Sequence, residues 1–381
     1  MIKKSIYSFL FIAVISAQNP VDVLRPFWGF NNSQILSNSI GGATVASGYI
    51  TPGLTSNPAN LAAMRFSYMQ LNFSNSEFSS ATSNMSNSGF NGIDFVQPIP
   101  VYRGSLVLSA GAHKSIDFMS TSSDNTYEYS EKGKLTSYHL GAAVEFAKRL
   151  YLGADIKLLR GNDEMVEHGQ EVTHYYKPEF SGSALTLGLM HVITKNLQYG
   201  ISFDMPRKVS IEDYYTESNH INEDESSSES DIWYYDAKKP MTVHLGGAMI
   251  TRVLNLFYEL EYTDWTNLEF SSDTYGLQDI LDINNEIKDE FGATLIHHIG
   301  GAMRLPIIPA HLFAGYQYLP TPFKDSYNNL RESYSLGFSV ALKKNFTLQG
   351  SYDTYFWEFN GSPESYDKFS IGVSLHNIPG L

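Results

Sequence analysis

The sequence predicts an all-β fold: a transmembrane antiparallel β-barrel of about 14 strands, with an N-terminal segment folded as a plug inside the lumen. Three features of the chain predict it. The N-terminus has the pattern of an export signal. The body of the chain alternates apolar and polar residues in runs long enough to cross a bilayer as strands, and the connections between these runs are short and long in turn.

The first residues have the composition of a secretory signal peptide. Two lysines form a positive start, residues 6–15 are mostly apolar, and a small residue, Ala17, offers a cleavage site. The apolar run is shorter than the roughly 20 residues that a membrane-spanning helix needs. We therefore expect residues 1–17 to be a cleaved signal peptide; an uncleaved anchor is the alternative.

The overall composition narrows the class of protein further. Tyrosine, phenylalanine and tryptophan number 25, 23 and 4 and together make up 14% of the chain, which suits aromatic girdles at two membrane interfaces. Cysteine is absent, so neither disulfides nor thiolate metal sites stabilise the fold. The net charge of −14 argues against nucleic acid as a partner.

Alternation with a period of two recurs from residue 66 to the C-terminus. In one clear example, one face of a strand is apolar and the opposite face is polar. The apolar face has Leu254, Leu256, Tyr258, Leu260 and Tyr262, and the polar face has Asn255, Glu259, Glu261 and Thr263. Such runs reach the roughly 9–11 residues of a tilted spanning strand, and an even strand number suits a closed barrel. We predict strands at residues 66–76, 88–97, 103–115, 134–147, 150–162, 180–193, 196–207, 240–250, 253–265, 293–304, 309–319, 331–342, 345–357 and 367–376.

The connections between these strands alternate between turns of a few residues and long loops. The predicted long loops are residues 77–87, 116–133, 163–179, 208–239, 266–292, 320–330 and 358–366. Short periplasmic turns and long extracellular loops are typical of barrels in the outer membrane of a diderm bacterium, so we expect the N-terminus in the periplasm. The acidic, serine-rich loop 208–239 is expected to be solvated and mobile, with divalent-cation binding as the alternative.

The segment before the first strand lacks strand alternation. Residues 18–64 are rich in glycine and other small residues and are too few to form a core of their own. We therefore expect a hatch, defined as residues 18–64, that fills the lumen of a barrel formed by residues 65–381, because a wide barrel must be filled to prevent leakage. A disordered periplasmic tail is the alternative.

Motifs in the hatch carry a resemblance to a known family. Residues 40–46 (IGGATVA) and 55–62 (TSNPANLA) resemble the hatch of FadL/TodX-type outer-membrane transport proteins, in which a GGA stretch precedes an Asn-Pro-Ala motif. Residues 262–266 (YTDWT) and 315–322 (GYQYLPTP) resemble strand ends of the same family. The resemblance spans nearly the whole mature chain, although the terminal Phe common among outer-membrane barrels is missing.

The resemblance implies passive uptake of hydrophobic compounds such as long-chain fatty acids. It implies an apolar pocket in the lumen, gating by the hatch and a sideways exit through the wall, so that an apolar molecule does not enter water. The residues it assigns to hatch and gating are Gly41, Gly42, Asn57, Pro58 and Ala59. The expected partners are a hydrophobic small molecule and outer-membrane lipid, with the protein a monomer that needs no cofactor.

Charged residues on the polar faces of predicted strands are candidate lumen groups. These are Asp155, Lys157, Glu259, Glu261 and Asp353. Two interpretations stay open: the charges pair with one another and support the hatch, or they hold the head group of an amphipathic ligand.

Enzymatic and metal chemistry find little support in the sequence. We identify no catalytic nucleophile, which disfavours an outer-membrane lipase, and we predict no metal site. The two histidines of the loop 163–179, His168 and His174 beside Glu167 and Glu171, are the weak exception.

Residues 277–291 have the spacing of an amphipathic helix that packs on the barrel rim or captures ligand. A protein-secretion accessory or binding scaffold is the alternative function.

Overall fold

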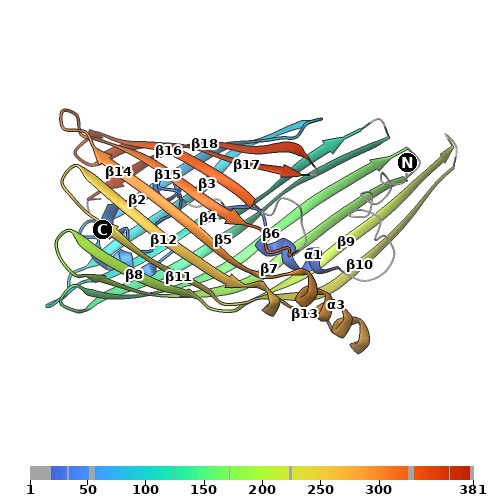
Figure 1. The fold of residues 1–381 in the computed structure, drawn as a ribbon, viewed down its shortest axis with the longest axis horizontal. Coiled ribbons are helices and arrows are strands. Elements are labelled where there is room, and N and C mark those ends of the chain that lie inside the picture. Colours follow the sequence, from blue (N-terminus) through green and yellow to red (C-terminus); the bar gives the residue numbers. More distant parts are fainter. Residues whose placement is uncertain are drawn as a thin grey trace.

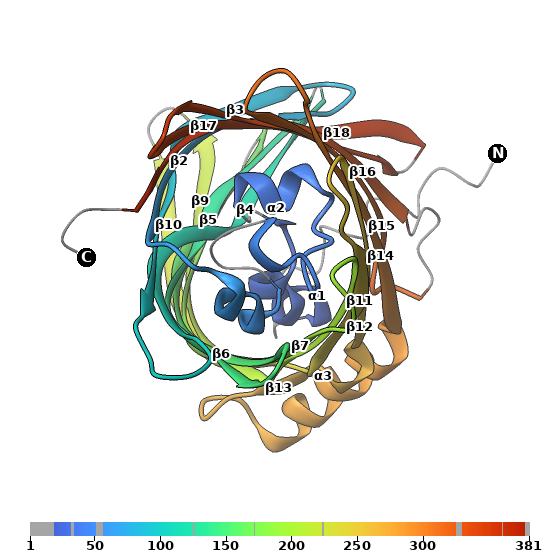
Figure 2. The ribbon, with the colours of Figure 1, turned by 90° about the vertical axis from the view of Figure 1, so that its left-hand side faces the viewer.

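The computed structural model describes eight stretches of the chain, and the predicted signal peptide lies outside them. Within them the chain forms one elongated antiparallel β-barrel, seen from the side in Figure 1 and end-on in Figure 2. The described stretches are residues 19–31, 34–50, 56–124, 126–170, 172–222, 225–324, 330–359 and 361–377.

The wall of the barrel is built from long strands that are mostly hydrogen-bonded to their neighbours in sequence. Their bounds are β2 (Tyr68–Ser79), β3 (Asn84–Ile99), β4 (Leu106–Ser123), β5 (Tyr127–Ala147), β6 (Leu150–Gly169), β7 (Val172–Val192), β8 (Leu197–Asp204), β9 (Arg207–Asn222), β10 (Glu225–Lys239), β11 (Thr242–Met249), β12 (Leu254–Asp264), β13 (Glu269–Ser271), β14 (Ala293–Arg304), β15 (Ala310–Pro320), β16 (Leu330–Lys343), β17 (Phe346–Phe359) and β18 (Ser362–His376).

Three of the wall strands are each interrupted once. β8 and β9 follow one another along the same neighbour, β7, and Pro206 lies between them. β11 and β10 are likewise separated at Pro240, and the short helix η5 (Trp265–Asn267) separates β12 from β13. Proline has no N–H to give to a ladder, so each proline ends one segment. Counted this way, the described wall has 14 strands, as predicted.

The barrel is closed by its first and last strands. β18 pairs with β2 along an antiparallel ladder that runs from Ser365 opposite Ser79 to His376 opposite Tyr68. Closure leaves no free strand edge at the seam, which is the condition for a sheet that stands in lipid.

The predicted loops 116–133, 163–179 and 208–239 are wrong. The strand pairs β4–β5, β6–β7 and β9–β10 continue through most of these segments. The reason lies in aromatic residues that recur among the polar ones: the rings of Tyr215 and Trp233, for example, stack with centroids 5.4 Å apart. Paired side chains of this kind stabilise a strand even where acidic residues and serines fill the remaining positions.

Along the spanning strands the predicted faces are confirmed. On β12, Leu256 points outward and is 43% exposed, whereas Glu259 points into the lumen and is 1% exposed. The outer face of the wall carries many large exposed apolar side chains, among them Leu140, Ile156 and Leu245. No helix in the described stretches is long and apolar enough to cross a membrane.

The described part of the hatch lies inside the barrel, as the end-on view shows (Figure 2). It consists of short elements: α1 (Pro20–Leu24), η2 (Arg25–Phe27), β1 (Phe30–Asn31), α2 (Ile35–Ser39), η3 (Gly48–Ile50) and η4 (Pro58–Ala63). Their side chains belong to the same apolar clusters as the inner face of the wall. The hatch therefore has no separate core and shares the barrel's interior.

The predicted amphipathic helix is confirmed as α3 (Leu277–Glu290). Its buried residues, Ile283 and Ile287, pack with Trp265 and Leu268 in the cluster that also contains α1. Leu277 and Leu281 are exposed.

Candidate functional site

The glycine pair of the hatch makes a turn against the wall. Gly41 and Gly42 have φ of +62° and +73°, a backbone conformation that glycine adopts without strain. The Gly41 carbonyl oxygen lies 2.8 Å from Nδ1 of His298 on β14, and its N–H donates to the Ser335 hydroxyl on β16 at 3.2 Å. A Cβ on Gly41 would collide with the backbone of Tyr316. Conformation and close approach both require glycine here.

The Asn-Pro-Ala motif fixes a second part of the hatch to other wall strands. The Asn57 side-chain amide donates to the Val45 carbonyl at 2.8 Å and to the Leu189 carbonyl on β7 at 2.9 Å. Its oxygen accepts from the Ala59 N–H at 3.0 Å and so caps η4, with Pro58 at the first helical position. One buried side chain thus joins two hatch segments and the wall.

Glycines of the wall, which the sequence analysis did not single out, receive the hatch backbone. A Cβ on Gly188 would fall on the Asn57 side-chain oxygen, and one on Gly153 would fall on the Pro58 carbonyl carbon. Three further wall glycines would collide with the hatch backbone in the same way if they carried a Cβ: Gly200 with Val45, Gly300 with Ile40, and Gly315 with Gly41. An inward position held by glycine within a strand is the sequence signal that could have found them.

One of the predicted lumen carboxylates, Glu259, contacts the hatch directly, and a second, Glu261, contacts a histidine that does. Glu259 accepts hydrogen bonds from the N–H groups of Thr44 and Val45, both at 2.7 Å, and from the Ser56 hydroxyl at 3.2 Å. Its other oxygen lies 2.9 Å from Nδ1 of His244. Glu261 lies 3.4 Å from Nε2 of His298, the histidine that contacts the Gly41 carbonyl.

The other three predicted lumen residues do not contact these two carboxylates; Asp155 and Lys157 lie together and Asp353 lies elsewhere on the wall. Asp155 contacts Nδ1 of His139 at 3.3 Å, and Lys157 lies 3.7 Å from Asp155 and donates to the Thr186 hydroxyl at 3.3 Å. Asp353 accepts from the Ser351 hydroxyl at 3.2 Å and is the cross-strand partner of Lys368. All three are wall residues, and Asp353 also forms a side-chain hydrogen bond with Asn38 of the hatch.

A large apolar cluster, which we call the chamber, lies in the half of the lumen that is bounded by the extended hairpins β4–β5, β6–β7 and β9–β10. We call this half the long-loop half and the opposite one the short-turn half. Its wall residues are Ile116, Phe118, Leu135, Leu159, Phe180, Val209, Ile211, Tyr235 and Ala237. Val23 and Leu24 of α1 and Phe27 of η2 occupy it. Arg25 lies 3.3 Å from Asp163 and 3.6 Å from Glu131. Burial lowers the pKa of its guanidinium, but Asp22, Asp163 and Glu131 outweigh this and hold that pKa well above its usual value.

The ladder between β3 and β4 is incomplete. The two strands pair only where residues 92–99 face 106–113. Beyond this point the register between β4 and β5 shifts between Lys114 and Ile116, a bulge that bends a strand. The β1 strand of the hatch then pairs with β4, with Phe30 opposite Asp117. Ile116 and Phe118, just beyond the bulge, belong to the chamber. The chamber therefore adjoins the interrupted ladder.

Two hollows adjoin the described residues, and the larger one is lined in part by the chamber residues Phe180, Ile211 and Tyr235. The larger, about 550 Å³, follows a row of polar side chains of the wall that includes Arg160, Ser181, Ser210 and Asp236. The smaller, about 200 Å³, lies between the hatch and the wall, lined by Gly48, Tyr151 and other residues. Val23, Leu24 and Phe27 of the hatch pack into the apolar chamber, where a lumenal pocket was expected.

Similarity to known proteins comes from structure, since neither a protein-family model nor a curated protein matches the sequence. A crystal structure of a Pseudomonas aeruginosa FadL homologue superposes with a TM-score of 0.68 at 12% identity and covers 92% of this chain and 100% of that one. The CymD monoaromatic hydrocarbon channel gives 0.66 at 15% identity over 91% and 97%. The Pseudomonas putida toluene transporter TodX gives 0.64 at 13% identity over 92% and 99%. The chain therefore has the fold of FadL/TodX-type outer-membrane transport proteins, as its hatch motifs predicted.

Proposed function

We propose that this protein is an outer-membrane channel for passive uptake of hydrophobic compounds, with the chamber as its ligand site. The observation that carries the proposal is the enclosed apolar chamber adjoining the incomplete β3–β4 ladder. Burial of apolar surface is the main force that a lumen can offer to a fatty acid or a hydrocarbon. We place the ends of the extended hairpins β4–β5, β6–β7 and β9–β10 outside the cell and the N-terminus in the periplasm, with the protein a monomer.

The ligand enters by displacing α1 and η2 from the chamber. Val23, Leu24 and Phe27 contribute apolar contacts, to which Phe27 adds a cation–π contact with Arg207 at 5.4 Å. An apolar ligand of similar size can replace apolar contacts because they are not directional. The ligand then leaves sideways between β3 and β4, where residues 84–91 of β3 have no ladder partner on β4. The hatch gates this step through Gly41, Gly42 and the Asn57–Ala59 motif.

The experiment introduces polarity into the chamber and follows uptake of two probes. Phe180→Asn should lower uptake of radiolabelled oleate and of toluene at least tenfold in cells, because the chamber wall loses an apolar ring. Phe369→Asn makes the same change on the outer face, where the side chain is half exposed, and should leave uptake unchanged. Heat-modifiable gel mobility checks that both barrels fold.

The relative effect on oleate and toluene identifies the ligand class. If cells carrying the unaltered protein take up neither probe faster than cells without it, channel function is excluded and a secretion or scaffold role is favoured. Replacing Asn57 and Pro58 by Ala tests gating separately: altered uptake through a folded barrel supports it, and unaltered uptake removes it.

A further inference from the structure

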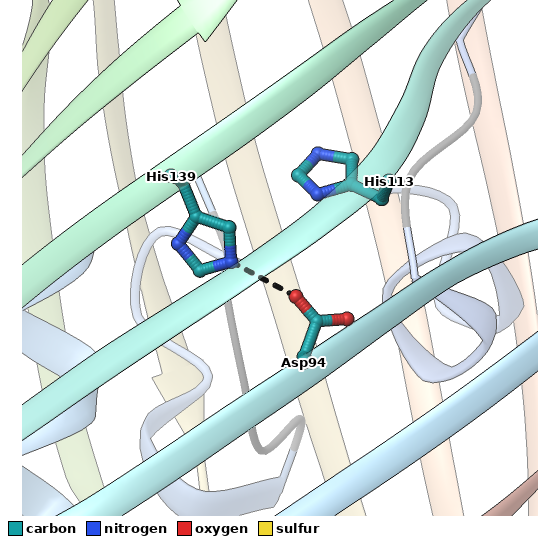
Figure 3. A group of neighbouring side chains, drawn as sticks. All are labelled: Asp94, His113 and His139. Carbon is teal, nitrogen blue, oxygen red and sulfur yellow. Dashed lines mark hydrogen bonds and ion pairs between the residues drawn. The ribbon is translucent and has the colours of Figure 1, made fainter.

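A buried group of two histidines and a carboxylate lies on the inner face of the wall, outside the residues assigned to the hatch and chamber. Asp94 on β3, His113 on β4 and His139 on β5 stand on three neighbouring strands and point to the same side (Figure 3). Each offers one ligand atom, and the three atoms lie within 4.8 Å of one another.

Glycine at the centre of the group makes this proximity possible. Gly111 on β4 is the cross-strand partner of both Asp94 and His139. A Cβ on Gly111 would lie 2.5 Å from Nε2 of His139 and 2.6 Å from Oδ1 of Asp94. Because no side chain stands between them, Asp94 and His139 meet across β4, with Nε2 and Oδ1 3.0 Å apart. His113, two residues along the same strand, completes the group.

The polar atoms of the group are not fully satisfied by the described residues. Oδ2 of Asp94 and Nδ1 of His113 are both inaccessible to solvent and have no hydrogen-bond partner there. Asp94 is completely buried. A buried polar atom without a partner costs about 1–3 kcal/mol, so two of them in one group indicate a missing occupant.

The surroundings suit a cation. Nδ1 of His139 lies 3.3 Å from Asp155, and a proton held in that contact directs the lone pair of Nε2 toward Asp94 and His113. A carboxylate behind a metal-binding histidine is the usual second partner in zinc sites. Two imidazole nitrogens and one carboxylate oxygen are ligands that divalent transition ions, zinc in particular, prefer.

We propose that Asp94, His113 and His139 bind one Zn²⁺ ion, with Asp155 as the residue that orients His139. The ion connects β3, β4 and β5 at the last rung of the β3–β4 ladder, where Gly92 faces His113. Zinc-to-ligand distances of about 2.0–2.2 Å require the three ligand atoms to move closer together. The half-buried His113 is the side chain with room to move.

The test uses purified full-length protein in detergent, without a polyhistidine tag and stripped of metal. We expect one Zn²⁺ per chain by isothermal titration calorimetry, and one Co²⁺ per chain by the visible absorption of the ion in a site of nitrogen and oxygen ligands. His113→Gln and Asp94→Asn should each lower the affinity at least tenfold. Asp155→Asn should weaken binding by about 10–100-fold while the stoichiometry stays at one.

Matched controls remove histidines elsewhere on the wall. His191→Ala and His311→Ala should leave zinc binding unchanged, and gel mobility before and after heating verifies that each variant is folded. Absence of a stoichiometric ion, or binding that survives both His113→Gln and Asp94→Asn, overturns the proposal. If binding instead follows His168→Ala or His174→Ala, the ion belongs to the β6–β7 hairpin and the proposed site is wrong.

Discussion

The hatch contacts the barrel in two different ways. In the short-turn half, hydrogen bonds to specific atoms hold it, and its backbone lies directly on wall glycines, as Pro58 does on Gly153. In the long-loop half, α1 and η2 rely on apolar side chains and on one cation, Arg25, among three carboxylates. Directional contacts fix a position, whereas apolar contacts can be exchanged for those of another apolar molecule. In the proposed function, the first part of the hatch is fixed and the second part is exchangeable.

The outer face of the wall differs between the same two halves. The short-turn half carries exposed apolar residues such as Leu140 and Ile156, as a surface in contact with lipid requires. The long-loop half carries charges, including the ion pairs of Lys208 with Asp236 and of Lys238 with Glu269. The β-sheet is continuous across the boundary between the two halves. The change from apolar to charged side chains on the outer face, and not the end of the strands, therefore marks the edge of the lipid.

The largest expected effect separates these two outer surfaces. Ile156→Arg places a charge on the apolar belt and should lower the free energy of unfolding by about 2–4 kcal/mol. Ile232→Arg, at an outward position of β10 in the long-loop half, should change it by about 0–1 kcal/mol. Urea unfolding in liposomes measures both. Equal effects would mean that lipid covers the acidic hairpin as well.

The fixed part of the hatch should depend on the Glu259 carboxylate. Glu259→Gln removes the charge that receives the Thr44 and Val45 N–H groups, and hydrogen bonds to a charged group are worth about 1.5–3 kcal/mol. Amide hydrogen exchange should then accelerate in residues 44–48, and Glu229→Gln on the exposed hairpin serves as control. Faster exchange in residues 20–24 alone would reverse the assignment of fixed and exchangeable parts.

Adjacent glycines offer a sharper version of the same comparison. A Cβ on Gly300 would fall on the Ile40 carbonyl, whereas one on Gly301 meets nothing closer than 3.8 Å. Gly300→Val should therefore cost about 1–3 kcal/mol, the usual penalty for overpacking, and admit small polar antibiotics by displacing the hatch. Gly301→Val should do neither. The two variants are compared by unfolding and by antibiotic sensitivity of cells.

Much of the barrel could be predicted because one physical rule governs each spanning strand. Lipid outside and a polar lumen inside force alternation, and the alternation of β12 placed Leu256 and Glu259 on the correct faces. The rule stops where lipid stops. Beyond the chamber residues Ile211 and Tyr235, acidic residues and serines fill many positions of β9 and β10, so the pattern looked like a loop. Diagonal cross-strand contacts such as the stacked rings of Tyr215 and Trp233 help to make it a hairpin.

The candidate site was predictable only in part, for a related reason. Gly41 and Asn57 could be predicted because a positive φ and a helix cap each depend on a few neighbouring residues in the sequence. The group of Asp94, His113 and His139 comes from three strands and depends on the register that brings Gly111 between them. A bulge such as the one after Lys114 leaves no mark that sequence patterns reveal. Contacts that depend on strand register and on bulges can be identified only from the folded sheet.

The smallest effect on stability should come from protease cleavage of the connections at the two ends of the barrel. Because the described residues of β9 and β10 are paired along nearly their whole length, we expect them to resist cleavage. A glutamate-specific protease added to whole cells should therefore cut once near residue 223 and leave the barrel folded and its heat-modifiable mobility unchanged. Trypsin should cleave the turn at Lys343 and Lys344 only after the outer membrane is permeabilised, because this turn lies at the opposite end. Mass spectrometry of the fragments identifies both cuts. Cleavage at Lys343 in intact cells, with the hairpin spared, would place the long-loop end in the periplasm and invert the direction of uptake.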